Sequence, residues 1–228
     1  MQPSSNAPIF RPIAERAVLV EFGTKLDQAV HDAVLRLDQA LAAQPFVGFR
    51  EAIPAFVNLL VEFDPLITDH PNVTAHLRGL LTAKTTARAQ PVQREVLICY
   101  DAALAPDLAA VAQQTGLSLE AVINAHLSGD YAVFMYGFAP GYAYLGGVPE
   151  AIRLDRKPAP VRNIPAGSVI IAGAQCLVTT LLMPTGWWII GRSPTAILTQ
   201  DPARPFLFDV GDKVRFRRIT RAEYEVAQ

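Results

Sequence analysis

The stretch GFAPGYAYLGG, residues 137–147, decides how this chain folds. It places four glycines and one proline among three aromatic residues. Each interior Gly would cost a helix about 1 kcal/mol relative to Ala, and a Pro about 3 kcal/mol. A central strand is also disfavoured, because Pro cannot donate to the sheet ladder. We therefore predict a shaped loop, since Gly tolerates positive φ and close backbone approach. The residues expected to shape it are Gly137, Pro140, Gly141, Gly146 and Gly147.

Two later stretches have the same character. They are IPAGSVIIAG, residues 164–173, and GWWIIGRSP, residues 186–194. Pro165 and Gly167 are expected to fix the path of the first of these. Three such loops in one β-rich region predict a single shared surface.

Composition excludes several classes of protein. Of the 228 residues, 51 % are hydrophobic and 18 % are charged, which argues against disorder. The formal net charge is −1, so no basic field points to nucleic acid or to a membrane surface. Cys99 and Cys176 are predicted to be buried, reduced thiols, and no metal-ligand spacing is present. The N-terminus lacks a signal pattern, and no apolar run approaches about 20 residues, so we expect a cytoplasmic protein.

The first part of the chain, residues 1–90, alternates strands and helices. Strands are predicted at 17–22, 47–53 and 56–63, and Asp69 is predicted to cap a helix. A helix with one apolar stripe is expected between the first two strands. The order β-α-β-β-α, with a possible last strand at 96–100, predicts a ferredoxin-like domain. The polar segment 82–93 resembles a linker, which places the boundary near residue 90.

The second part, residues 91–228, begins with a helical pair and becomes β-rich after Gly129. Helices are predicted at 106–114 and after the N-cap Ser118. Strand candidates are residues 131–136, 168–172, 175–181, 187–190, 196–198 and 213–217. Many short strands with Gly and Pro turns predict a barrel or a sandwich. The fold class expected overall is α+β.

Four ordered motifs resemble the carboxyltransferase C/D-subdomain family. This family includes Kip-type kinase inhibitors, the protein long labelled allophanate hydrolase subunit 1, and the B-type subunit of bacterial ATP-dependent 5-oxoprolinase. The motifs are the three glycine-rich stretches and residues 208–216, FDVGDKVRF. The resemblance implies a cyclophilin-like β-barrel for residues 91–228.

The resemblance also implies function and partners. It implies a hydrolase subunit that is inactive alone and works in a hetero-oligomer with two others, a carboxyltransferase-like C-type subunit and an amidohydrolase-like A-type subunit. The assembly would open 5-oxoproline to glutamate with ATP, at the level of the complex. Two alternatives stay open. The chain could inhibit a sensor histidine kinase, or it could be a subunit of a system that carboxylates urea or an amide or hydrolyses allophanate. The segment after Gln175 departs from the family's usual Thr-Gly-Ile-Tyr-Pro, so the strand there is predicted to run on.

Several residues could carry chemistry. His126 lies at a helix end, and is either a satisfied core-edge histidine or a general acid/base; the family resemblance places a histidine there. Arg156, Arg162 and Arg192 lie nearest the glycine loops, where Arg can hold a carboxylate or phosphate, whereas Lys157 is expected to be solvated.

Polar and aromatic side chains complete the candidate set. Gln175 could hydrogen-bond an amide or carboxylate, and one of Tyr142 and Tyr144 could line a pocket while the other packs. Trp187 and Trp188 should face opposite sides of a strand, one in the core and one at a subunit interface. Tyr136, Phe138 and Ser168 are weaker candidates. No nucleotide-binding P-loop motif is present, so this chain alone is not expected to bind ATP.

Overall fold

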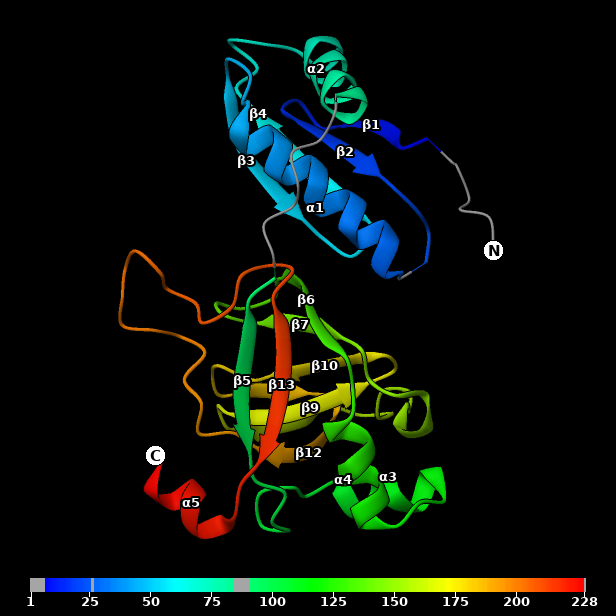
Figure 1. Ribbon diagram of the computed structural model, residues 1–228, viewed down its shortest axis with the longest axis vertical. Helices are drawn as coiled ribbons and strands as arrows, with labels where there is room; N and C mark the ends of the chain where they lie inside the picture. Colours follow the sequence, from blue (N-terminus) through cyan, green and yellow to red (C-terminus); the bar gives the residue numbers. More distant parts are fainter. Residues whose placement is uncertain (1–6, 26, 84–90, 228) are drawn as a thin grey trace. The chain divides into compact units, whose positions relative to one another are not determined.

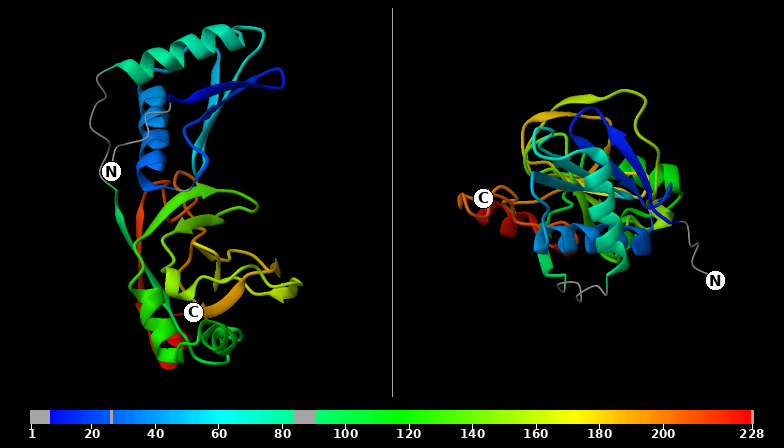
Figure 2. Two further views of the ribbon diagram at one scale, coloured as in Figure 1. Left: turned by 90° about the vertical axis from the view of Figure 1, so that its right-hand side faces the viewer. Right: turned by 90° about the horizontal axis from the view of Figure 1, so that it is seen from above.

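The computed structural model describes residues 7–25, 27–83 and 91–227 (Figures 1 and 2). By its internal contacts the chain forms two compact units, Met1–Gln90 and Pro91–Gln228. The predicted linker 82–93 lies partly outside the described residues, and a domain boundary within it stays a prediction. No described helix is long and apolar enough to cross a membrane. The predicted α+β class is confirmed.

The first unit is a four-stranded antiparallel sheet with two helices. Its elements are β1 (Ile9–Ile13), β2 (Ala17–Glu21), α1 (Gln28–Ala43), β3 (Phe49–Pro54), β4 (Asn58–Phe63) and α2 (His70–Thr82). The strand order is β1-β2-β4-β3. Both helices contribute to one core with alternate residues of β2 and β4, such as Val18, Val20, Leu59 and Val61, all 0 % exposed. The period of two along each strand places these side chains on one face.

The helix starts agree with the sequence. Asp69 caps α2, accepting from the Asn72 amide at 2.9 Å, with Pro71 in the first turn. Asp27 caps α1 in the same way, through the amides of Ala29 and Val30. Such side-chain acceptors satisfy donors that the first helical turn leaves unpaired.

The structure adds one strand that the sequence did not reveal. Strand β1 lies at the sheet edge beside β2, the place that a final strand would take in a split βαβ domain. It contains Pro12, which edge strands tolerate, and its side chains are mostly exposed, so no apolar alternation marks it. The candidate strand at 96–100 instead belongs to the second unit, as β5 (Gln93–Ile98).

The second unit is a seven-stranded sheet that curls into a nearly closed barrel. Its strands are β5, β6 (Tyr131–Tyr136), β7 (Ala143–Gly146), β9 (Ser168–Ala172), β10 (Gln175–Val178), β12 (Trp188–Arg192) and β13 (Lys213–Arg218). Their order is β12-β9-β10-β7-β6-β13-β5, and only β13 and β5 run parallel. The helices α3 (Leu108–Thr115) and α4 (Leu119–Leu127) pack against β12 and β13. A 3-10 turn (Glu150–Ile152), the pair β8 (Val161–Ile164) and β11 (Met183–Thr185), and α5 (Arg221–Val226) complete the unit.

A two-residue bridge joins the two edge strands of this sheet. Past the end of β5, the Cys99 amide donates to the Arg192 carbonyl at 2.8 Å, and the Arg192 amide donates back to Cys99 at 3.0 Å. Gly191 makes this approach possible. A Cβ there would lie 2.8 Å from Ile98 Cδ1 and 3.0 Å from the Cys99 carbonyl oxygen. The bridge brings the end of β12 next to the end of β5, although the two strands are almost a hundred residues apart.

Three sequence predictions for this unit need correction. The stretch 137–147 is a loop only in its first half, because β7 pairs with β6 and β10 in the middle of the sheet. Pro140 lies in the loop half, so the ladder loses no donor. Strand β10 ends at Val178, rather than running on to residue 181. The candidate strand 196–198 is reduced to one bridge, between Leu198 and Phe206.

Gly191→Ala should destabilise the second unit by about 2 kcal/mol, because the added methyl overpacks the barrel closure. Gly186→Ala, two residues before β12 begins, is the matched control. Its Cβ would meet only the Lys157 carbonyl at 3.8 Å, an ordinary contact, so we expect a change within about 0.5 kcal/mol. Urea unfolding of both variants measures the difference, and equal stabilities would contradict this account of the closure.

Candidate functional site

A cavity of about 370 Å³ opens in the second unit beside the barrel closure. It lies between the loops that precede β9, follow β10 and follow β12, and α5 contributes one residue. The lining residues are Ala166, Gly167, Thr179, Thr180, Arg192, Ser193, Pro194, Thr195, Ala196, Ile197, Leu198 and Tyr224. The volume is in the range of small-molecule sites in proteins.

Backbone hydrogen bonds hold the second and third glycine-rich loops together. Gly167 donates to the Thr179 carbonyl at 2.6 Å and accepts from the Ser193 amide at 2.7 Å. It has a φ of +80°, and a Cβ there would lie 2.4 Å from the Ser193 carbonyl oxygen, so no larger residue fits. The Thr179 amide still donates to the Ser168 carbonyl at 2.9 Å, but the Ser168 amide donates to the Thr179 hydroxyl, at 2.9 Å, and not to its carbonyl. That hydroxyl in turn donates to the Pro165 carbonyl at 2.8 Å. These bonds explain why β10 stops at Val178.

The first glycine-rich loop reaches the same place. The Thr180 hydroxyl donates to the Pro140 carbonyl at 2.6 Å. Gly141, which has a φ of +72°, lies against Leu198 of the cavity wall. Gly147 also has a positive φ, of 116°, but it directly follows β7, whose last residue is Gly146, and Gly137 directly follows β6. Parts of all three loops therefore converge on the cavity.

Arg192 is the one charged side chain among the lining residues. Its Cδ lies 3.3 Å from the position of a Gly167 Cβ, so the side chain lies across that glycine. Its Nε is buried without a hydrogen-bond partner among the described residues. The cavity therefore combines one cation with hydroxyl groups and an apolar wall.

Tyr142, Tyr144 and Arg156 gather instead around Trp187, in a separate apolar cluster. Tyr142 is 4 % exposed and packs in the core of that cluster, while the Tyr144 ring contacts Trp187 edge-on at 6.0 Å. The Arg156 guanidinium lies 5.7 Å from the Trp187 ring centroid, a cation–π distance. Burial raises the pKa of Tyr142 to about 12, so its phenol stays neutral near pH 7.

Gln175 and Arg162 lie away from the cavity. Gln175 pairs with Ala172 at the hairpin end of β9, whereas Arg192 pairs with Ser168 at the opposite end. Arg162 is exposed on β8. The predicted binding residues therefore do not form one site, and only Arg192 of the three arginines lines the cavity.

His126 is completely buried among core side chains. Its Nδ1 lies 2.7 Å from the Tyr100 hydroxyl, and its Nε2 lies 3.5 Å from Cys176 Sγ. Burial lowers the pKa of His126 to about 3, which keeps it neutral. These contacts match the satisfied core histidine, and they give a general acid/base no path to a substrate. Both cysteines are free and buried, as predicted, and burial raises the pKa of the Cys176 thiol.

Two other predictions are wrong. Trp187 and Trp188 do face opposite sides, but both are buried, at 6 % and 8 % exposed, so neither marks an interface. They belong to two different clusters of the core. Lys157 is not solvated, because it pairs with Asp107 at 2.6 Å and lies over the Trp188 ring. Asp107 also accepts from the Ile189 amide at 2.7 Å, which fixes the start of α3 to β12.

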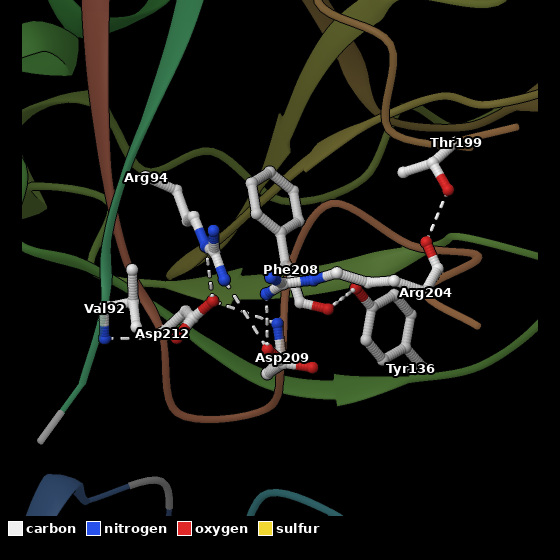
Figure 3. Close-up of polar contacts among 8 residues, drawn as sticks. All are labelled: Val92, Arg94, Tyr136, Thr199, Arg204, Phe208, Asp209 and Asp212. Atoms are coloured by element: carbon white, nitrogen blue, oxygen red, sulfur yellow. Dashed lines mark hydrogen bonds and ion pairs between the residues drawn. The ribbon is translucent and has the colours of Figure 1, made fainter. Parts of the chain in front are cut away.

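The fourth motif forms a polar network at another end of the barrel (Figure 3). Asp212 accepts from Arg94 Nε at 2.8 Å, from the Val92 amide at 3.2 Å and from the Asp209 amide at 3.0 Å. Asp209 also pairs with Arg204 at 2.9 Å, as Figure 3 shows. The network ties the start of β5 to the turn before β13, so its role is structural.

Tyr136 completes this network. Its hydroxyl donates to the Phe208 carbonyl at 2.8 Å (Figure 3). Its ring stacks on Phe206, with the ring centroids 5.0 Å apart. Burial, together with the carboxylates of Asp209 and Asp212, raises the pKa of Tyr136. The phenol is therefore a fixed neutral donor.

Comparison with known families gives a match over most of the chain. The family described as carboxyltransferase domain, subdomain C and D, matches residues 8–208. The chain belongs to this family. The resemblance to this family is thus confirmed, and the matched region spans all three glycine-rich stretches.

Three relatives show the range of the family. The chain is 35 % identical to the 5-oxoprolinase B subunit of Bacillus subtilis (strain 168), over 93 % of each chain. It is 37 % identical to the 5-oxoprolinase B subunit of Escherichia coli O157:H7, over 90 % of this chain and 93 % of the relative. Among solved structures, TTHA0988 superposes with a TM-score of 0.78 at 36 % identity, over 90 % of this chain. The matched region covers only 40 % of the TTHA0988 chain, so that chain is much longer than the one described here.

Sequence reasoning missed several residues of the cavity. Thr180 and Leu198 lie in segments predicted as strands, and Ser193 carries no signal beyond its place in the third glycine-rich stretch. Tyr224 comes from α5, whose start carries a Thr-x-x-Glu capping box at Thr220 and Glu223. That signal predicts the helix, but nothing in it places Tyr224 beside residues 166–198.

Asp212→Asn should destabilise the second unit by about 2 kcal/mol, because it removes the nearer of the two carboxylates that pair with the largely buried Arg94 guanidinium and leaves only the exposed Asp209, at 3.5 Å. Asp130→Asn removes the exposed partner of Lys213 and should change stability by less than about 0.5 kcal/mol. Urea unfolding compares the two. A cost for Asp212→Asn as small as that of the control would show that the network contributes little.

His126 should make stability fall as the pH is lowered. Its folded pKa of about 3 lies below the ordinary 6.5, so the unfolded state binds the extra proton between these values. The contribution of His126 to the free energy of unfolding is complete above pH 6.5. Below pH 6.5 it is lost, by up to about 1.4 kcal/mol per pH unit.

The comparison variant is His126→Asn, which cannot titrate. Burial raises the pKa of Asp38, in the first unit, to about 6, and that group acts in the opposite direction. The difference between wild type and variant therefore isolates the histidine. Urea unfolding of both proteins from pH 7 to pH 5 measures it, and parallel pH profiles would refute the assignment.

Proposed function

We propose that this chain is the B-type subunit of an ATP-dependent 5-oxoprolinase complex and is inactive alone. One water would open the lactam C–N bond of 5-oxoproline to give glutamate, and a second would hydrolyse ATP to ADP and phosphate. The observation that carries the proposal is the cavity at the barrel closure. Most of its lining residues lie within the region that the family matches, and they supply a binding cation and hydroxyl groups but no nucleophile with a neighbouring base.

Two comparisons support a role within an assembly. The curated relatives of almost equal length are named as subunits, at 35 % and 37 % identity. In TTHA0988 the equivalent region is part of a chain that is more than twice as long. A further polypeptide beside this fold is therefore a natural source for the groups that the cavity lacks. We propose that the carboxyltransferase-like C-type subunit supplies them and that the amidohydrolase-like A-type subunit completes the complex.

The residues of the cavity do not fit a nucleotide triphosphate. A triphosphate site needs several cations or free backbone amides, and carboxylates for magnesium. Here Arg192 is the one lining cation, and no carboxylate lines the cavity. The amides of Gly167 and Ser193 already donate within the protein. We therefore propose that ATP binds to a partner or between subunits.

Reconstitution tests the proposal. The chain is co-purified with the carboxyltransferase-like and amidohydrolase-like subunits, and glutamate and ADP are measured after addition of 5-oxoproline and ATP. We expect both products from the full complex, and no glutamate from the chain alone or from a complex that lacks it.

Two controls sharpen the assay. Urea replaces 5-oxoproline in one arm, and consumption of ATP only with urea would favour the carboxylating alternative. ATP binding to the isolated chain is measured by calorimetry in another arm. No glutamate from the complete complex, or tight ATP binding to this chain alone, would overturn the proposal.

A further inference from the structure

The Arg192 guanidinium forms no ion pair with a carboxylate of the described residues. No other residue that lines the cavity is an Arg, Lys, Asp or Glu. The Arg192 Nε is buried without a partner among the described residues. A buried donor without a partner is unfavourable, so the site favours an acceptor from outside the chain.

The fold also holds this side chain in place. The backbone of Arg192 is fixed on both sides by the bridge to Cys99 and by the ladder to Ser168. Its aliphatic part lies across Gly167, where a Cβ would come within 3.3 Å of Cδ. An arginine held in this way loses little freedom on binding, and preorganisation of this kind raises affinity.

The remaining donors of the cavity select the kind of anion. Phosphate sites draw on several free backbone amides. Here the Gly167 amide donates to Thr179, the Ser193 amide to Gly167, and the Thr195 amide to Ser193 Oγ at 3.1 Å. One planar guanidinium matches the two oxygens of a carboxylate.

The rest of the wall suits a small, partly apolar molecule. Pro194, Ala196, Ile197 and Leu198 give the cavity an apolar part of its wall. A volume of about 370 Å³ admits a ligand of a few ring atoms together with its carboxylate.

We propose that this cavity is a carboxylate-binding subsite, in which the Arg192 guanidinium holds the carboxylate of a small molecule whose apolar part lies against residues 194–198. The inference rests on the proposed function only for its choice of probe. The isolated chain is sufficient to test it, because every lining residue belongs to the second unit.

The test is an NMR titration of the ¹⁵N-labelled full chain with two matched ligands. One is 5-oxoproline, and the other is 2-pyrrolidinone, which has the same ring without the carboxylate. We expect 5-oxoproline to shift the amides of Gly167, Ser193 and Thr195, and 2-pyrrolidinone to bind at least about tenfold more weakly. Inorganic phosphate in a third arm should bind more weakly than 5-oxoproline.

Variants test the residue itself. Arg192→Gln should weaken 5-oxoproline binding at least about tenfold, whereas Arg192→Lys should keep part of it, because Lys offers a charge without the planar fork. The matched control is Arg215→Gln, which removes an exposed arginine on β13 and should leave binding unchanged. The two-ligand comparison on wild type does not depend on any variant folding.

Four results would overturn the proposal. They are equal binding of 5-oxoproline and 2-pyrrolidinone, tighter binding of phosphate, unchanged binding by a folded Arg192→Gln protein, and no shift of the cavity amides at millimolar 5-oxoproline. None of these depends on ATP or on the partner subunits. A reconstituted complex that makes glutamate while the isolated chain fails this titration would refute the subsite and leave the proposed function standing.

Discussion

The structure of the second unit depends on the backbone bridge between Cys99 and Arg192. A seven-stranded sheet that curls by its own twist still has two edges with unpaired donors and acceptors. Two hydrogen bonds, of 2.8 and 3.0 Å, join those edges at one end, and the absence of a side chain at Gly191 lets the strands approach. The same bridge fixes the backbone from which the Arg192 side chain extends. The same two hydrogen bonds therefore close the barrel and position the Arg192 side chain in the cavity.

The glycine-rich loops follow from this closure. Once the end of β12 is fixed, the next residue, Ser193, reaches Gly167 with its amide, and Gly167 in turn reaches Thr179. Each bond satisfies a backbone group that would otherwise be buried without a partner. The amides of Gly167 and Ser193 thus donate within the protein, whereas Arg192 Nε has no hydrogen-bond partner among the described residues. The cavity thus has one strong donor group for a ligand, and this is the physical basis of the proposed carboxylate subsite.

Titratable groups elsewhere in the barrel have structural roles. Asp212 is surrounded by three donors, and His126 is neutral between Tyr100 and Cys176. In both places, burial is matched by partners within the chain, which is the usual condition for a stable buried polar group. Arg192 differs because its partner is missing from the described part of the chain. That contrast distinguishes a binding group from a structural one more clearly than residue type does.

Local signals in the sequence determined much of this protein. The caps at Asp69 and Ser118, the strands at 131–136 and 168–172, and the four motifs were all visible from residue type and spacing, because they depend on nearby backbone groups. Gly167 and Arg192 could likewise be chosen as site residues from the motifs alone. The tertiary structure decided which candidates meet. It placed Gln175 and Arg192 at opposite ends of β9, buried His126, added Tyr224 from α5 and gave β1 its edge position. Those outcomes depend on strand order and on contacts between residues far apart in the chain, which neither periodicity nor composition encodes.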